Sequence, residues 1–112
     1  MGEPVQSVRE VFDVHIPSRL KAKPDLIGKI NAVYQFHIAG AEGGNWSVDC
    51  TQPGGVVTAG TAAAPRCTVS MVDADFLKLV TGKLNAQMAF MTGKIKIQGD
   101  MGLAMKLQQL LG

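Results

Sequence analysis

The first thirty residues carry apolar side chains at helical spacing. This spacing predicts a helix over residues 5–15. Its apolar positions are Val5, Val8, Phe12 and Ile16. Pro17 is expected to end or kink this helix, because a proline ring blocks the interior of a helix. Pro24 suits the first position of another short helix, which brings Leu26, Ile27 and Ile30 onto one side.

Beyond residue 33 the apolar period changes from helical spacing to strict alternation. Apolar and polar residues alternate in "VYQFHIAG", "NWSVDCTQ" and "CTVSM". A short strand is also predicted at residues 56–58, and a fifth at residues 94–98. Each strand is polar on one face, which is typical of an antiparallel sheet with one solvated and one covered side.

Helix start and stop signals follow the fourth strand. Asp73 and Asn85 are expected to cap two short helices, which Gly82 and Gly93 end. Asp100 is the expected N-cap of a final helix. The chain is therefore predicted to be one α+β domain over residues 1–112, with helices covering one face of a small sheet.

The final helix is more apolar than a surface helix requires. One face suits contact with the sheet and contains Leu103, Ala104, Leu107 and Leu110. Further apolar residues lie beside or beyond this face, at Met101, Met105 and Leu111. These residues predict a second contact, which is a ligand, another subunit or a membrane surface.

Composition narrows the classes of function. The chain has 112 residues, of which 46% are hydrophobic and 18% charged, so it is not a disordered chain. Its net charge of +2 is too small for a nucleic-acid-binding protein, although it permits weak attraction to an anionic membrane. We find no transmembrane run, signal peptide or C-terminal peroxisomal tripeptide, and a cytoplasmic location is expected.

The sequence offers no motif for catalysis. It contains no Gly-x-Ser-x-Gly elbow and no P-loop, so neither an enzyme nor a cofactor is expected. His15 and His37 are not spaced as metal ligands with Cys50 or Cys67. Both cysteines are expected to be buried, reduced thiols. We therefore predict neither catalytic nor metal-binding residues.

Several long segments resemble the sterol carrier protein family of the nonspecific lipid-transfer type. "MVDADFLKLVTGKLNAQMAFMTGKIKIQGDMGLAMKLQQLL", residues 71–111, resembles its C-terminal half. "IGKINAVYQFHI" and "GGNWSVDC" resemble its first two strands. The resemblance implies a five-stranded, mostly antiparallel sheet with about five helices covering one face and enclosing an apolar tunnel. It also implies binding and transfer of a fatty acid, fatty acyl-CoA, phospholipid or sterol.

An adaptable apolar lining would suit such ligands, and methionine fills irregular space well. The expected lipid-binding residues are Phe36, Trp46, Phe76, Val80, Leu84, Met88, Met91, Met101, Leu103, Met105 and Leu111. Lys94, Lys96 and Lys106 are candidate contacts for lipid head groups. The final helix and residues 82–84 are candidate gates.

Two functions remain open from the sequence. The first is a lipid carrier, expected to be a monomer with transient membrane contact, although a dimer is left open. The alternative is a protein-interaction or substrate-presenting module that docks through its apolar C-terminal helix.

Overall fold

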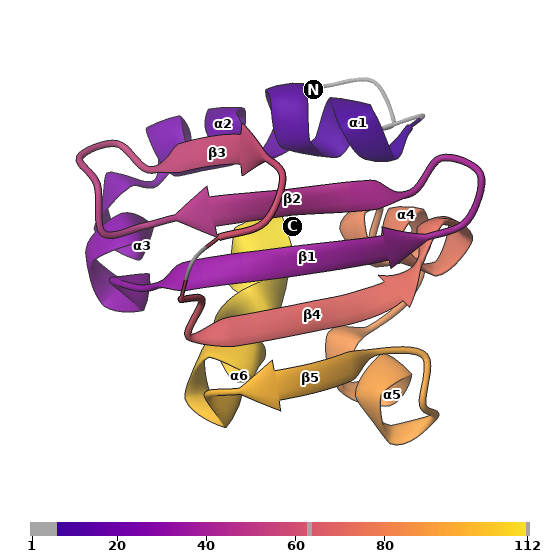
Figure 1. The fold of residues 1–112 in the computed structure, drawn as a ribbon. Coiled ribbons are helices and arrows are strands. Elements are labelled where there is room, and N and C mark those ends of the chain that lie inside the picture. Colours follow the sequence, from indigo (N-terminus) through magenta and orange to yellow (C-terminus); the bar gives the residue numbers. More distant parts are fainter. Residues whose placement is uncertain (1–6, 63, 112) are drawn as a thin grey trace.

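Five strands form one mixed sheet in the order β3-β2-β1-β4-β5 (Figure 1). The computed structural model describes residues 7–62 and 64–111. The strands are β1 (Val33–Ala39), β2 (Gly44–Asp49), β3 (Val56–Ala59), β4 (Cys67–Val72) and β5 (Lys96–Gly99). Three neighbouring pairs are antiparallel, whereas the central strands β1 and β4 are parallel. The prediction of a mostly antiparallel sheet is therefore confirmed, although the central pair of strands is parallel.

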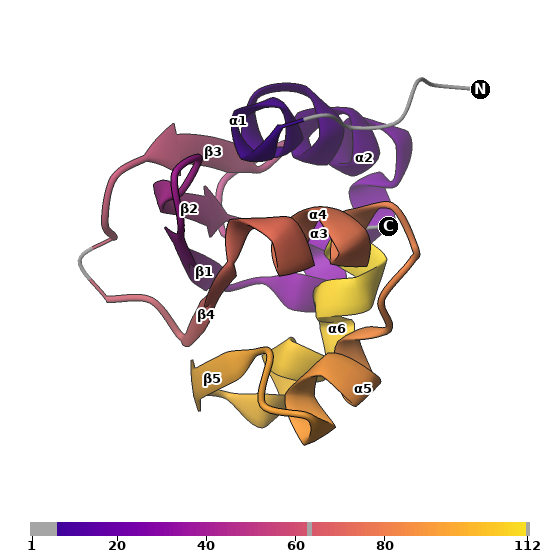
Figure 2. The same ribbon diagram turned by 90° about the vertical axis from the view of Figure 1, so that its right-hand side faces the viewer.

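Helices cover only one face of this sheet, as Figure 2 shows in a view along its edge. The helical elements are α1 (Val8–Glu10), the π-helical turn η1 (Val11–His15), α2 (Ile16–Ala22), α3 (Pro24–Ile30), α4 (Asp73–Val80), α5 (Ala86–Met91) and α6 (Met101–Leu111). Because α1, η1 and α2 are continuous, the described residues contain five helical runs. Among these residues, no helix has the length and hydropathy needed to cross a bilayer.

The first helix does not end at Pro17, which was one of the two outcomes that the sequence predicted; it continues through an irregular turn next to this proline. The main-chain N–H of Ile16 bonds to the carbonyl of Val11, which is the five-residue spacing of a π-turn. Proline lacks an N–H, and its ring crowds the carbonyl four residues earlier. The wider turn just before Pro17 relieves this conflict, so the helix continues to Ala22. The predicted start at Val5 lies outside the described residues.

The late helices begin and end largely where the sequence predicted. The side chain of Asn85 accepts hydrogen bonds from the main-chain N–H groups of Gln87 and Met88, which caps α5. Asp100 caps α6 by accepting from Gly102 at 2.8 Å. Gly82 follows α4 with a φ of +82°, the left-handed conformation that glycine tolerates at a helix C-terminus.

Asp73 is the exception among the predicted caps. The extended residue before α4 is Val72, and Asp73 is already the first residue of the helix. The Asp73 carboxylate instead accepts hydrogen bonds from the main-chain N–H groups of Ala74 and Glu42, at 2.7 and 3.1 Å. This side chain therefore ties the start of α4 to the β1–β2 connection.

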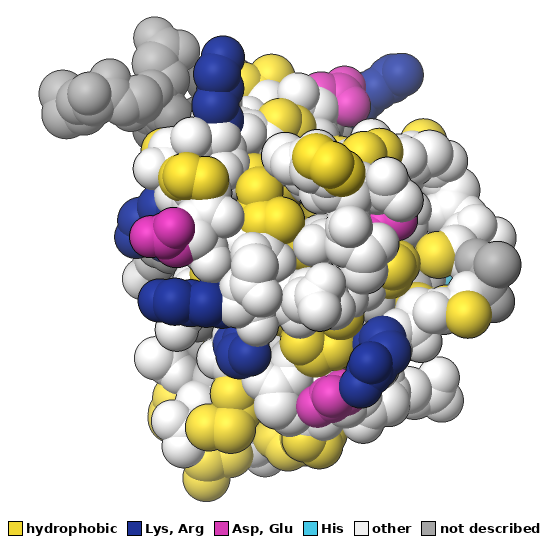
Figure 3. All heavy atoms as spheres, turned by 90° about the vertical axis from the view of Figure 1, so that its left-hand side faces the viewer, with side chains coloured by type: hydrophobic (Ala, Val, Ile, Leu, Met, Phe, Trp, Pro, Cys, Tyr) yellow, Lys and Arg dark blue, Asp and Glu magenta, His cyan; other side chains and the backbone are white. Residues whose placement is uncertain are grey.

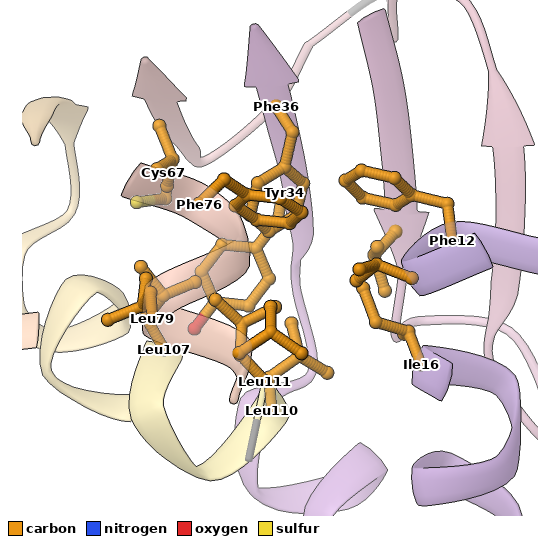
Figure 4. Packing of buried hydrophobic residues seen from close by; sticks show 14 of the residues in the cluster. Phe12, Ile16, Tyr34, Phe36, Cys67, Phe76, Leu79, Leu107, Leu110 and Leu111 are labelled. Carbon is orange, nitrogen blue, oxygen red and sulfur yellow. The ribbon is translucent and has the colours of Figure 1, made fainter. Parts of the chain in front are cut away.

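One hydrophobic core lies between the sheet and the helices and runs from Val8 to Leu111. Figure 4 shows Leu107, Leu110 and Leu111 of α6 pointing into this core toward Tyr34. Phe12 of η1 stacks on Phe76 with the ring centroids 5.4 Å apart. Residues from the first and last helices thus share one packed interior, which fixes α6 against the sheet.

Gln35 departs from the alternation of solvated and covered positions. The alternation in "VYQFHIAG" predicts a solvated position for Gln35, but this residue is only 2% exposed. Its Nε2 donates to the carbonyls of Trp46 and Gly60, and its Oε1 accepts from the N–H of Ala62. The β3–β4 connection thus covers this position on the face opposite the helices (Figure 2), and main-chain groups replace water as its hydrogen-bond partners.

Candidate functional site

A groove of about 410 Å³ lies between α5, β5 and α6. This volume falls within the range of about 300–1,000 Å³ that is typical of small-molecule sites. Its walls are formed by Asn85, Ala86, Gln87, Phe90, Ile95, Ile97, Met101, Ala104, Met105 and Leu107. The groove therefore joins three elements that follow one another along the last quarter of the chain.

Local turns bring these three elements together. The N–H groups of Lys94 and Ile95 both bond to the carbonyl of Ala89, so the chain folds back immediately after α5. Gly99 ends β5 with a φ of +102°, and an added Cβ would lie 2.3 Å from the carbonyl oxygen of Arg66. Only glycine fits this turn, which sends the chain through Asp100 into α6.

The groove wall is apolar apart from two amide side chains. None of the ten wall residues is ionisable, and the polar ones are Asn85 and Gln87. Met101 and Met105 lie four residues apart on α6, which places them on the same face of that helix. Their exposed fractions are 48% and 82%, so the groove is open to solvent. Such a surface is suited to an alkyl chain and offers no group for acid–base chemistry.

The sequence-predicted lipid-binding residues do not all meet at this groove. Of the eleven, Met101 and Met105 belong to its wall. Met88 and Met91 of α5 are exposed and do not belong to the groove wall. Leu84 is partly buried against the core.

The other predicted lining residues lie in or against the packed core. The buried ones are Phe36, Phe76, Val80, Leu103 and Leu111. Trp46 is partly buried, and its ring stacks on Phe12 at 4.5 Å with an interplanar angle of 6°. Aromatic side chains therefore occupy the space between the sheet and the first helix. The enclosed apolar tunnel that the family resemblance implied is not confirmed.

Sequence reasoning missed Phe90 and Ile97 as parts of the same wall. Both carried a usable signal. Phe90 lies four residues after Ala86 on α5, which predicts a shared face. Ile97 alternates with Lys96 and Gln98 and so belongs to the covered side of β5. Their meeting depends on the angle between α5 and β5, which sequence periodicity does not specify.

Lys106 does not lie with the other candidate head-group contacts. Its ammonium donates to the carbonyl of Lys29 at 2.9 Å, on the side of α6 that faces α3. Lys94 and Lys96 are exposed at the start of β5 and share a hollow with Asp75. None of the three candidate lysines therefore belongs to the groove wall.

The buried cysteine thiols of the core are in their unreactive, protonated form at neutral pH. Burial raises the pKa of the Cys50 and Cys67 thiols to about 11, so both remain protonated at neutral pH. Within residues 7–62 and 64–111, no group of three or more His, Cys, Asp or Glu side chains is placed to hold a metal ion.

Comparison with known proteins identifies the family of this chain. The model of the SCP-2 sterol transfer family matches residues 15–112. The chain belongs to this family. An NMR structure of palmitated SCP2L2 from Aedes aegypti is 34% identical and superposes with a TM-score of 0.73, over 95% of both chains.

Two curated relatives are similar in sequence but much longer. Sterol carrier protein 2 of Homo sapiens is 45% identical over 87 residues, which are 75% of this chain and 16% of that protein. Hydroxysteroid dehydrogenase-like protein 2 of Xenopus tropicalis is 47% identical over 81 residues, which are 71% of this chain and 19% of that protein. The chain thus spans less than a fifth of either relative, and the second name describes a protein of which the matching region is one part.

Proposed function

We propose that this chain is a lipid carrier that holds an acyl chain in the groove between α5, β5 and α6. The observation that carries the proposal is an open, uncharged groove whose walls include Met101, Met105, Phe90 and Ile97. Two comparisons support the proposal. The chain belongs to the SCP-2 sterol transfer family, and the similar Aedes aegypti structure is of a palmitated protein.

The expected affinity follows from the area that an alkyl chain would bury. Complete burial of about 16 methylenes contributes on the order of 12 kcal/mol. An open groove covers roughly half of the alkyl chain, which reduces this contribution accordingly. The entropy lost on association subtracts several kcal/mol from what remains. Binding is therefore expected to be weak to moderate and to depend on chain length. Because methionine adapts to different shapes, fatty acids, acyl-CoAs, phospholipids and sterols are all candidate ligands.

The deeper residues would take part only after a movement of α6. Leu103 and Leu111 lie on the inner side of this helix and contact the core. A ligand would reach them, or Phe36 and Phe76 behind them, if α6 moved away from β1. We propose α6 as the gate, with Leu84 and Val80 at its other edge.

Groove-filling variants test the site directly. Ala104→Trp and Ala86→Trp each place an indole in the groove, and we expect them to reduce binding of a fluorescent fatty acid about tenfold or more. Ala74→Trp, on the exposed start of α4, is the matched control. Native mass spectrometry of the purified protein would show copurified lipid. The proposal is wrong if unsubstituted protein carries no lipid and binds no fatty acid.

A second candidate function is a module that presents lipid to a separate enzyme. The length of the curated relatives favours it, because the matching region is 19% and 16% of those proteins. This function shares the groove and adds a protein contact through α6, where Met105 is 82% exposed. Gln109 is exposed on α6 and lies outside the groove wall. A Gln109→Glu variant that keeps soluble fatty acid binding but loses enzyme-coupled turnover would support this function.

A further inference from the structure

We propose that the surface around the mouth of the groove docks on an anionic lipid bilayer. We call this surface the methionine face and define it as Met88, Phe90, Met91, Met101 and Met105. Their exposed fractions are 57%, 46%, 72%, 48% and 82%. Among the described residues, eight large hydrophobic side chains are exposed, and these five lie on α5 and α6. The other three are Val14, Val56 and Val72, each on a different element.

A ligand in the groove does not account for the whole face. Phe90, Met101 and Met105 belong to the groove wall, but Met88 and Met91 do not. These two side chains stay exposed when an alkyl chain fills the groove. Figure 3 shows hydrophobic side chains gathered at the lower end of the molecule, where Figure 1 places α5, β5 and α6. An apolar cluster of this kind on a soluble surface indicates an interaction site.

The lysines that follow α5 indicate that the methionine face binds an anionic membrane surface. Residues 76–99 contain four lysines and no Asp or Glu. Lys94 and Lys96 follow α5 directly and are exposed. Among the residues that the structure describes, the ion pairs are Arg9–Asp13 and Arg66–Asp100, so neither lysine is neutralised in this way. Asp75, in the hollow beside them, is the one carboxylate lining it.

Apolar side chains that insert beside lysines are the combination that binds anionic membrane surfaces. Phosphates of the bilayer would meet Lys94 and Lys96, while the methionines enter the boundary between head groups and acyl chains. This inference rests on the proposed function, because the groove opens on the same face. An acyl chain could then pass between bilayer and groove without crossing water.

The test measures binding of the full chain to vesicles of phosphatidylcholine alone and of phosphatidylcholine with phosphatidylserine. We expect binding to require phosphatidylserine and to weaken with salt. Lys94→Gln with Lys96→Gln should lower the affinity about 25-fold, since each lysine near an anionic surface contributes about fivefold, or ~1 kcal/mol. Lys21→Gln with Lys23→Gln removes the same charge from α2 and its end, and is the matched control.

The apolar contribution has its own pair of variants. Met88→Gln with Met91→Gln should lower vesicle affinity about tenfold or more, because two thioether side chains no longer insert. Val14→Gln with Val56→Gln removes two exposed apolar side chains elsewhere and should change little. Fatty acid binding, measured without vesicles, should be unchanged in all four double variants.

Three results would overturn the inference. The first is that the control and test lysine variants lose vesicle binding equally. The second is that the protein binds vesicles of phosphatidylcholine alone as well as it binds vesicles with phosphatidylserine. The third is that the protein forms a dimer in solution and that Met88→Gln with Met91→Gln abolishes this dimer. Failure of the proposed function gives a different pattern, which is vesicle binding retained by a protein that binds no fatty acid in solution.

Discussion

The hydroxyl of Tyr34 donates a 2.5 Å hydrogen bond to the main-chain carbonyl of Leu103. Tyr34 lies at the start of β1, and Leu103 lies in the first turn of α6. The bond is buried and joins residues 69 positions apart in the sequence. It therefore fixes one end of the helix that forms a wall of the groove, and it links the sheet to the proposed gate.

Tyr34→Phe should loosen this end of α6 at a small cost to the fold. The phenyl ring keeps its packing, and the Leu103 carbonyl keeps the N–H four residues later in the helix. Loss of one buried hydrogen bond is expected to lower the free energy of unfolding by about 1 kcal/mol in urea titrations. Hydrogen exchange should rise in residues 103–107 more than in β1. Unchanged exchange there would contradict the proposed role of this bond.

Alkaline pH should destabilise the protein through its buried thiols. Burial raises the pKa of Cys50 and Cys67 from 9.0 to about 11, and burial also raises the pKa of Tyr34 well above its usual 10. Above pH 9 the unfolded chain releases protons that the folded chain retains, so stability falls as the pH rises. Each thiol contributes a slope of at most about 1.4 kcal/mol per pH unit between pH 9 and 11.

Urea unfolding at pH 9, 10 and 11 measures this slope. Cys50→Ala with Cys67→Ala should make the fall shallower than in the unsubstituted protein, whatever its effect on absolute stability. Tyr34→Phe should change the slope only above pH 10, where the unfolded phenol ionises. Parallel curves for the cysteine double variant and the original protein would show that the thiols do not titrate as inferred.

The C-terminal end of α6 depends on side chains from the first helical run. Arg19 Nε donates to the carbonyl of Gln109 at 2.6 Å, and His15 Nε2 lies 2.5 Å from the carbonyl oxygen of Leu111. A cationic donor such as Arg19 near the last carbonyls of a helix is favourable. Arg19→Ala is expected to lower the free energy of unfolding by about 1 kcal/mol.

Arg9→Ala is the matched control for this prediction. Arg9 forms an ion pair with Asp13 at 3.6 Å, and both side chains are largely exposed. Its removal should cost less than about 0.5 kcal/mol, because exposed pairs contribute little. Equal losses in the two arginine variants, measured by urea unfolding, would mean that the contact with Gln109 does not hold α6.

The predictable parts of this fold are those with local causes. Asn85 and Asp100 were identified as caps because their oxygens reach N–H groups two or three residues ahead, and this geometry is contained in the sequence. Pro17 was expected to end or kink the first helix, and a π-turn just before it lets the helix continue. Gln35 was misjudged because a connection distant in sequence covers it. A local change of helical turn decided the first case, and contacts distant in sequence decided the second.

The difference between local causes and distant contacts also explains which residues of the candidate site could be predicted from the sequence. Met101 and Met105 were identified from their spacing on one helix, and the structure places them in the groove wall. Phe36 and Phe76 were expected to line a tunnel on the strength of the family resemblance, but their rings pack in the core, with centroids 6.0 Å apart. Hydrophobicity identifies what is covered. It does not distinguish cover by ligand from cover by protein, which depends on how tightly the helices approach the sheet.

The fluorescence of Trp46, the sole tryptophan, can distinguish these two kinds of cover. Trp46 stacks on Phe12, and its strand β2 is three strand intervals from β5, which is about 14 Å. If lipid occupies the groove alone, titration with palmitate should leave the emission maximum of Trp46 unchanged. Phe12→Leu should shift the emission without ligand, which would establish that the residue reports on its surroundings. A palmitate-dependent shift in the original protein would place the acyl chain between the first helix and the sheet. The core would then open on binding, Phe36 and Phe76 would become lining residues, and the groove would be an entrance to the site.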